Sequence, residues 1–209
     1  MKKLALTDFA KYRYPSALEL SPDGRYLAFA LKEVDREGDG YRWNLWLYDL
    51  ESRESRQITR GDDQRQAVWE DNIHILYKTT ELDEAMRARG FEEEWTVYHR
   101  LNVCTGEERE AFRLPMSVSG LWKMDEGRYV FTGETHLDRP NLLELTGEAL
   151  EKELVRRQQT KGYKVLTELP LCENGVGMFN QTRITLFLYL EATGEYRRIT
   201  PEDYDVNHV

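Results

Sequence analysis

The chain has 209 residues, of which 40% are hydrophobic and 11% aromatic, enough to bury a sizeable core. Charged residues make up 32% and the formal net charge is -9, which argues against nucleic acid and anionic membranes as partners, because both select basic patches. Two cysteines, Cys104 and Cys172, are too few for a disulfide framework, and neither stands at metal-ligand spacing. No apolar run is long enough for a secretory signal or a membrane span, so the sequence predicts a soluble, cytoplasmic protein.

A turn-and-strand pattern begins early in the chain and recurs. SALELSPDGRYLAFAL at residues 16–31 predicts a strand, a tight turn at Pro22-Asp23-Gly24 and a second strand. The segments RQAVWEDNIHILYKTT at 65–80 and VSGLWKMDEGRYVFTGET at 118–135 have the same plan. The pattern therefore indicates three copies of one structural repeat.

A second hairpin follows the first in each copy. WNLWLYDLESRESRQITRGDD at 43–63, WTVYHRLNVCTGEEREAFRLP at 95–115 and ITLFLYLEATGEYRRITPED at 184–203 each join two apolar runs by a polar turn. The turns are expected at 51–54, 104–107 and 192–195, and Gly106 and Gly194 supply the positive φ that such turns often need. Each copy thus predicts four strands in two successive hairpins.

The spacing of the copies locates an insertion. Glu54 and Glu107 are 53 positions apart, which suits one propeller blade with a modest insertion, whereas Glu107 and Glu195 are 88 positions apart. The excess lies in residues 138–164, whose middle predicts a helix: Thr146 can cap it, and Leu150 and Leu154 share one face. Two shortened blades are the alternative. A smaller insertion at 81–94 predicts either one helical turn around 82–89 or a charged loop.

Four-stranded repeats predict an all-β fold, a partial β-propeller of about three antiparallel blades. The expected blades are 14–63, 64–115 and 116–201, with the insertion 138–164 helical near 147–160 and the start of a fourth blade at 202–209. Both faces of RYLAFAL are apolar, as in a blade between two neighbours; a two-sheet sandwich, the rival fold, predicts polar and apolar alternation without a repeat. Since propellers close with about 4–8 blades, we expect a truncated, N-terminal piece of a longer chain that self-associates through open blade faces.

These residues resemble a known family. SPDGRYLAFAL followed by WNLWLYDLESRESRQITRGDD is similar to the propeller of the prolyl oligopeptidase family of serine peptidases. The third copy, YKVLTELPLCENGVGMFNQTRITLFLYLEATGEYRRITPEDYDV, resembles the acylaminoacyl-peptidase and dipeptidyl-aminopeptidase-like branch. The resemblance covers nearly the whole chain, although the Ser-Pro-Asp-Gly and Thr-Gly-Glu hairpins also occur in propellers that are not enzymes.

The resemblance implies that the chemistry lies elsewhere. The family carries its catalytic Ser, Asp and His in a C-terminal α/β-hydrolase domain, with the Ser in a Gly-x-Ser-x-Gly elbow. None of the six serines here has such flanks: Ser16, Ser21, Ser52, Ser55, Ser117 and Ser119. We therefore expect no catalytic, cofactor-binding or metal-binding residue and no cofactor in this chain, which alone should not hydrolyse peptides. Its expected partners are the hydrolase domain of the parent chain, to which it would gate access, and peptide substrates.

Several residues invite a functional interpretation and a structural one. The run Glu92-Glu93-Glu94 could bind a substrate amine, but a solvated charged loop is the favoured reading. The segment Gly175-Val176-Gly177 weakly resembles a phosphate-binding loop, but a turn is the favoured interpretation. The histidines, cysteines and tryptophans are read as structural: His74, His99, His136 and His208; Cys104 and Cys172; Trp43, Trp46, Trp69, Trp95 and Trp122.

The sequence is also compatible with two other functions. A non-catalytic propeller that binds protein partners through its loops would have the same repeats. A propeller hydrolase such as a glycosidase or lactonase would need acids around a central channel, and the sequence offers no clear acid pair for it.

Overall fold

The computed structural model describes residues 5, 7–35, 37–162, 166, 171–173, 177–179 and 181–206, with the side chains of 171–173 and 177–179 left aside. The chain forms two compact units. The first comprises Met1–Thr79 with Val97–Phe112, and the second comprises Thr80–Thr96 with Arg113–Val209.

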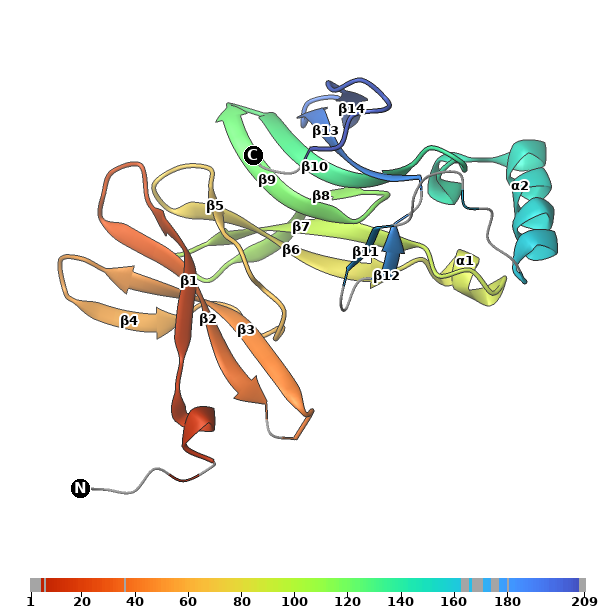
Figure 1. The fold of residues 1–209 in the computed structure, drawn as a ribbon. Coiled ribbons are helices and arrows are strands. Elements are labelled where there is room, and N and C mark those ends of the chain that lie inside the picture. The colour runs from red at the N-terminus through yellow and green to blue at the C-terminus, as the bar shows by residue number, and fades with distance from the viewer. Residues whose placement is uncertain are drawn as a thin grey trace. The chain divides into compact units, whose positions relative to one another are not determined.

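The first sheet lies in the first unit and follows chain order (Figure 1). After a short 3-10 helix, η1 (Asp8–Lys11), its strands are β1 (Tyr14–Leu20), β2 (Tyr26–Asp35), β3 (Gly40–Asp49) and β4 (Glu54–Gln57). The predicted turn before β2 is held by short-range hydrogen bonds: Ser21 Oγ donates to Asp23 at 2.6 Å and accepts from the Tyr26 amide at 2.9 Å. Gly24 there has a φ of +73°, which only glycine adopts without cost.

The second sheet has the same order. Its strands are β5 (Val68–Trp69), β6 (His74–Leu82), β7 (Glu94–Asn102) and β8 (Glu108–Leu114). The core of the first unit joins the first two sheets, because Ala28, Ala30 and Leu45 are fully buried in one cluster with Ile75 and Tyr77. The small alanines leave room for the larger side chains of the second sheet.

The third sheet lies in the second unit and is interrupted in sequence. Its order is β14-β13-β10-β9, with strands β9 (Val118–Asp125), β10 (Arg128–His136), β13 (Thr182–Leu190) and β14 (Glu195–Arg198). Phe131 is fully buried and stacks on Phe187 with ring centroids 5.0 Å apart. Three four-stranded antiparallel sheets among the described residues confirm the predicted all-β, partial propeller.

The long insertion between β10 and β13 is helical where the sequence predicts it. It contains η2 (Leu142–Glu144), α2 (Gly147–Thr160), and a two-stranded sheet of β11 (Leu171–Glu173) and β12 (Gly177–Phe179). Leu150 and Leu154 pack toward Leu142 as their spacing predicts. Thr146 occupies the N-cap position, but its side chain makes no capping hydrogen bond.

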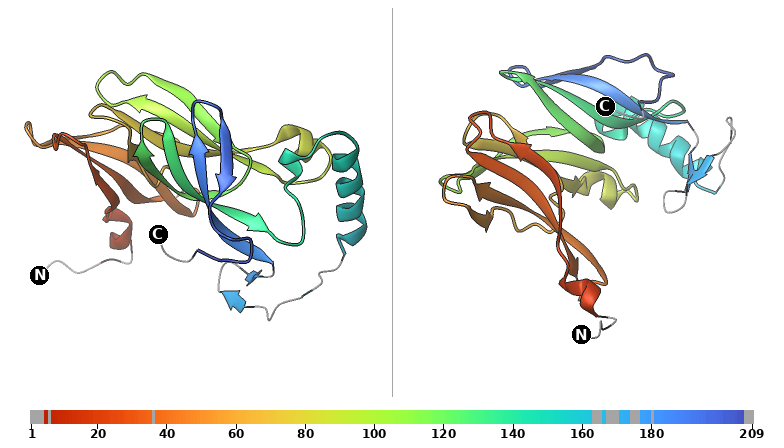
Figure 2. Two further views of the ribbon diagram at one scale, coloured as in Figure 1. Left: turned by 90° about the horizontal axis from the view of Figure 1, so that it is seen from above. Right: turned by 60° about the vertical axis from the view of Figure 1, so that its left-hand side comes forward.

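The smaller insertion forms a helix rather than a charged loop. Its helix α1 (Glu84–Ala88) begins after Asp83, whose side chain accepts from the Met86 amide at 2.9 Å. Met86 packs with Leu142 and Leu154, and Arg89 forms a two-pronged ion pair with Glu151 at 2.8 and 2.6 Å. The two insertions therefore pack on each other, and Figures 1 and 2 both show α1 beside α2.

The segment expected to open a fourth blade has no strand in its described part, residues 202–206. It returns to β13, where the Val206 amide donates to the Ile184 carbonyl at 2.9 Å. The start of a fourth blade thus stays a prediction. Within the described residues, no helix is long and apolar enough to cross a membrane.

Candidate functional site

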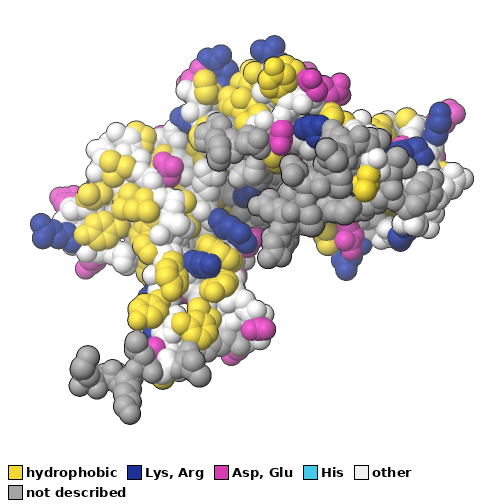
Figure 3. Space-filling model, viewed as in Figure 1, with side chains coloured by type: hydrophobic (Ala, Val, Ile, Leu, Met, Phe, Trp, Pro, Cys, Tyr) yellow, Lys and Arg dark blue, Asp and Glu magenta, His cyan; other side chains and the backbone are white. Residues whose placement is uncertain are grey.

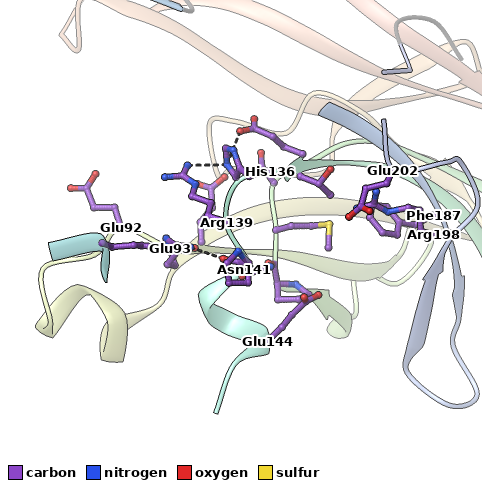
Figure 4. A pocket seen from close by; sticks show the side chains of 17 residues that line it. Glu92, Glu93, His136, Arg139, Asn141, Glu144, Phe187, Arg198 and Glu202 are labelled. Carbon is purple, nitrogen blue, oxygen red and sulfur yellow. Dashed lines mark hydrogen bonds and ion pairs between the residues drawn. The ribbon is translucent and has the colours of Figure 1, made fainter. Parts of the chain in front are cut away.

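A cavity of about 520 Å³ lies in the second unit (Figure 4). The ends of β10 and β14, the start of β7 and both helical insertions form its wall. Six carboxylates line it: Glu92, Glu93, Glu94, Glu134, Glu144 and Glu202. Against them stand three guanidinium groups, Arg139, Arg157 and Arg198, so the lining carries a net negative charge.

The acidic run 92–94 forms one side of the cavity, immediately after α1. Asp83 joins the two ends of this insertion: it caps α1 at the start and accepts a 2.9 Å hydrogen bond from the indole of Trp95, which follows the acidic run. The Trp95 bond and the Met86 amide lower the pKa of Asp83, which therefore stays ionised. Of the three glutamates, Glu92 is exposed, while Glu93 and Glu94 are partly buried. The favoured reading of a solvated loop thus describes Glu92 alone.

Arg157 of α2 anchors this side. Its guanidinium binds Glu93 at 2.7 Å, Glu153 at 3.1 Å and the Pro140 carbonyl at 2.6 Å. The Arg157 side chain is only 12% exposed, so its bonds to the partly buried Glu93 and the buried Glu153 are largely shielded from water and help to hold the insertion in place. Hydrogen bonds from Arg156 and then Arg157 lower the pKa of Glu153 against the effect of its burial.

His136, at the end of β10, lies in the middle of the cavity wall. Arg139 approaches its Nε2 at 3.0 Å, and Thr182 lies 3.2 Å from its Nδ1. Burial and the charge of Arg139 lower the pKa of His136 to about 4, so the ring is neutral at pH 7. Its 3.5 Å contact with Glu134 is therefore not an ion pair at that pH.

A general-base role for His136 toward Ser117, which also lines the cavity, does not fit this geometry. Arginine can only donate, so Nε2 accepts from Arg139 and Nδ1 carries the proton toward Thr182. Both ring nitrogens are engaged.

The opposite side of the cavity combines an aromatic ring with a cation. Figure 4 shows Phe187, Arg198 and Glu202 on one side and Glu92 and Glu93 on the other. Phe187 is 5% exposed and packs edge-on against Tyr196, whose hydroxyl donates to Glu144. Burial, and then the bond to Glu144, raise the pKa of Tyr196. Arg198 Nη1 is buried and has no hydrogen-bond partner among the described residues.

The other sequence candidates lie apart from this cavity. His74 bonds Asp71 at 2.8 Å, and His99 bonds Thr79 at 2.9 Å. Cys104 is exposed in a turn, and all five tryptophans stand in strands. His208 and positions 175 and 176 lie outside the described residues, as does the side chain of Cys172. No group of three or more potential metal ligands occurs in the described part of the chain.

Sequence reasoning missed the residues that complete the cavity, notably Arg139, Asn141, Phe187 and Arg198. The sequence shows that charged residues are concentrated in the insertions 81–94 and 138–164. It does not show that these two insertions contact each other. The contact between Glu93 and Arg157 spans 64 positions.

Solved structures share this fold. An acylaminoacyl peptidase in complex with Z-Gly-Gly-Phe-chloromethyl ketone matches 92% of this chain with a TM-score of 0.60 and 12% identity, over 26% of its own chain. Pyrococcus horikoshii acylaminoacyl peptidase matches 91% of this chain with a TM-score of 0.59 and 13% identity, also over 26% of its own chain. The AtxE2 isopeptidase matches 88% of this chain with a TM-score of 0.50 and 16% identity, over 29% of its own chain.

These matches concern the fold. No family model matches the sequence, and no curated protein does. The chain spans about a quarter of the length of the two acylaminoacyl peptidases. The chain therefore has a partial β-propeller fold that it shares with acylaminoacyl peptidases, in agreement with its resemblance to the prolyl oligopeptidase family.

Proposed function

We propose that this chain is the non-catalytic propeller segment of a cytosolic serine peptidase of the prolyl oligopeptidase type. It gates the access of peptides to a C-terminal α/β-hydrolase domain of the same parent chain. The observation that carries the proposal is the match of 92% of the chain to an acylaminoacyl peptidase. The cavity of the second unit supports the proposal, because its lining is polar and contains both carboxylates and guanidinium groups.

The size of the cavity suits a gating role. A volume of about 520 Å³ falls within the range of small-ligand sites, about 300–1,000 Å³. Such a space holds a few residues of an extended peptide and excludes a folded protein. Peptide backbones offer both hydrogen-bond donors and acceptors, and the lining offers carboxylates and guanidinium groups to match them.

The test is to label the native protein that carries this sequence. An antibody against the 209-residue chain recovers it from cells, and a fluorophosphonate probe reacts with activated serines. We expect a single labelled serine outside residues 1–209, within a Gly-x-Ser-x-Gly motif. A native protein that remains unlabelled, or that is labelled within residues 1–209, would refute the proposal.

A second candidate function, a propeller that binds protein partners, is favoured by one observation. Phe9, Tyr12, Tyr14, Leu18 and Leu20 are each at least 50% exposed, along η1 and β1 of the first unit. Figure 3 shows hydrophobic side chains gathered in this part of the molecule. Exposed apolar patches often mark interaction surfaces. The labelling experiment separates the two candidates, since a pure interaction module carries no reactive serine.

A further inference from the structure

We propose that the cavity of the second unit binds a free carboxylate, such as the C-terminus of a peptide, through Arg198. The inference rests on the proposed function, in which this cavity meets peptides, and it names the group that is recognised. Binding of that kind would favour short peptides and free chain ends over internal segments of a protein.

The position of Arg198 is fixed by strand pairing. Arg198 lies opposite Phe187 in the β13–β14 ladder, so the two side chains share one face of the sheet. Arg197 lies opposite Leu188 and therefore points to the other face. Arg198 lines the cavity, whereas Arg197 does not. Two adjacent arginines thus differ in access to the cavity and share the same strand.

One nitrogen of the Arg198 guanidinium, Nη1, lacks an acceptor among the described residues. This atom has essentially no exposed surface. A charged donor withdrawn from water without an acceptor is costly, and proteins leave few such groups. Because Arg198 also lines the cavity, a carboxylate that enters it would bring acceptor oxygens to this guanidinium.

Among the described residues, no carboxylate accepts a hydrogen bond from Arg198 Nη1. Glu93 is paired with Arg157, and Glu144 accepts the hydroxyl of Tyr196. Figure 4 places Glu92 on the opposite side. Glu202 lies near Arg198 in the same view, but it is exposed and forms no ion pair with it in the described structure. Water therefore screens the charge of Glu202, and that residue weakens ligand binding only modestly.

The apolar neighbours of Arg198 define what lies beside the carboxylate. Phe187 and Met116 both line the cavity and are 5% and 8% exposed. An apolar side chain on the last residue of a peptide can pack on them while its carboxylate meets Arg198. The ligand class is therefore a short peptide with a free C-terminus and an apolar last residue.

The experiment compares two probes that differ in one group. N-acetyl-Gly-Gly-Phe with a free carboxylate and the same peptide as its C-terminal amide are titrated into the 209-residue chain at low salt by calorimetry. The acetyl group removes the ammonium that the acidic side of the cavity could bind. We expect the amide to bind at least about tenfold more weakly, as loss of a charged hydrogen bond predicts.

Variants assign the effect to Arg198. Arg198→Gln should reduce binding of the acid to the level of the amide, Arg197→Gln should change it less than about twofold, and Glu202→Gln should strengthen it. Equal binding of acid and amide, binding of neither, or equal losses in the two arginine variants would overturn the carboxylate site. The fluorophosphonate result does not depend on these titrations, so the proposed function can stand when this inference fails.

Discussion

Arg157 of α2 donates a 2.7 Å hydrogen bond to Glu93, which precedes β7. The bond joins the two helical insertions beside the cavity, and the Arg89–Glu151 pair joins them a second time. Part of the cavity wall therefore comes from two insertions that interrupt the strand repeats and contact each other through ion pairs. Both insertions connect strands of the repeated sheets: one lies between β6 and β7, and the other between β10 and β13.

Removing Arg157 tests this dependence. Arg157→Met leaves Glu93 and Glu153 without a shared partner, and the two carboxylates are only 21% and 10% exposed. Breaking a buried ion pair from one side costs about 3 kcal/mol or more, so we expect a loss of that order in the free energy of unfolding. Urea denaturation followed by tryptophan fluorescence measures it.

Arg156→Met is the matched control. Arg156 also bonds Glu153, but its side chain is 47% exposed. We expect it to cost less than about 1 kcal/mol, as exposed ion pairs do. Equal costs for the two variants would show that Arg157 does not anchor the insertions.

The stacked pair in the third sheet gives a second prediction. Phe131 is fully buried against Phe187, and Phe131→Ala would leave a large void. We expect a loss of about 3 to 5 kcal/mol in the free energy of unfolding. Met124→Ala, at a 64% exposed position of β9, should change it by less than about 0.5 kcal/mol. A tolerated Phe131→Ala would contradict the assigned core.

The frame of the protein could be predicted from the sequence because its signals are local. Gly24 and Gly194 sit in turns with φ values of +73° and +71°, and the apolar runs on either side form the expected strands. Helix α2 could be predicted from Leu150 and Leu154, which lie one turn apart. These features depend on residues close together in the chain.

The cavity could not be predicted in this way because it depends on distant contacts. Glu93 and Arg157 meet across 64 positions. Arg198 faces the cavity and Arg197 does not, a distinction that depends on the register of β14 against β13. A shift of one residue would exchange them. Only the folded arrangement shows which of the two neighbours lines the cavity.

His136 gives the stability of the chain a dependence on pH. Burial and Arg139 lower its pKa from 6.5 to about 4 in the folded state. As the pH falls from about 6.5 to 4, His136 becomes protonated in the unfolded chain but stays neutral in the folded chain. The free energy of unfolding therefore decreases by up to about 3 kcal/mol over this window. His136→Gln should remove this part of the pH dependence of urea unfolding, and His74→Gln should retain it. An unchanged profile in His136→Gln would contradict the assignment.

The apolar patch of η1 and β1 predicts self-association. Pro15 and the irregular register between Ser16 and Glu19 blunt the free edge of β1, so we expect contact through side chains rather than an added strand. Light scattering should give a mass above 24.7 kDa that rises with concentration. Leu18→Lys should lower it, and Met124→Lys, exposed elsewhere, should not. A monomer at every concentration would contradict the prediction.

The proposed role as a peptidase propeller is tested by peptide hydrolysis, measured side by side for the 209-residue chain and for the native protein recovered with an antibody. If residues 1–209 are the propeller segment of a serine peptidase, the native protein hydrolyses acylated or free short peptides and the 209-residue chain does not. Turnover by the 209-residue chain, or inactivity of the native protein on every short peptide, would contradict this role.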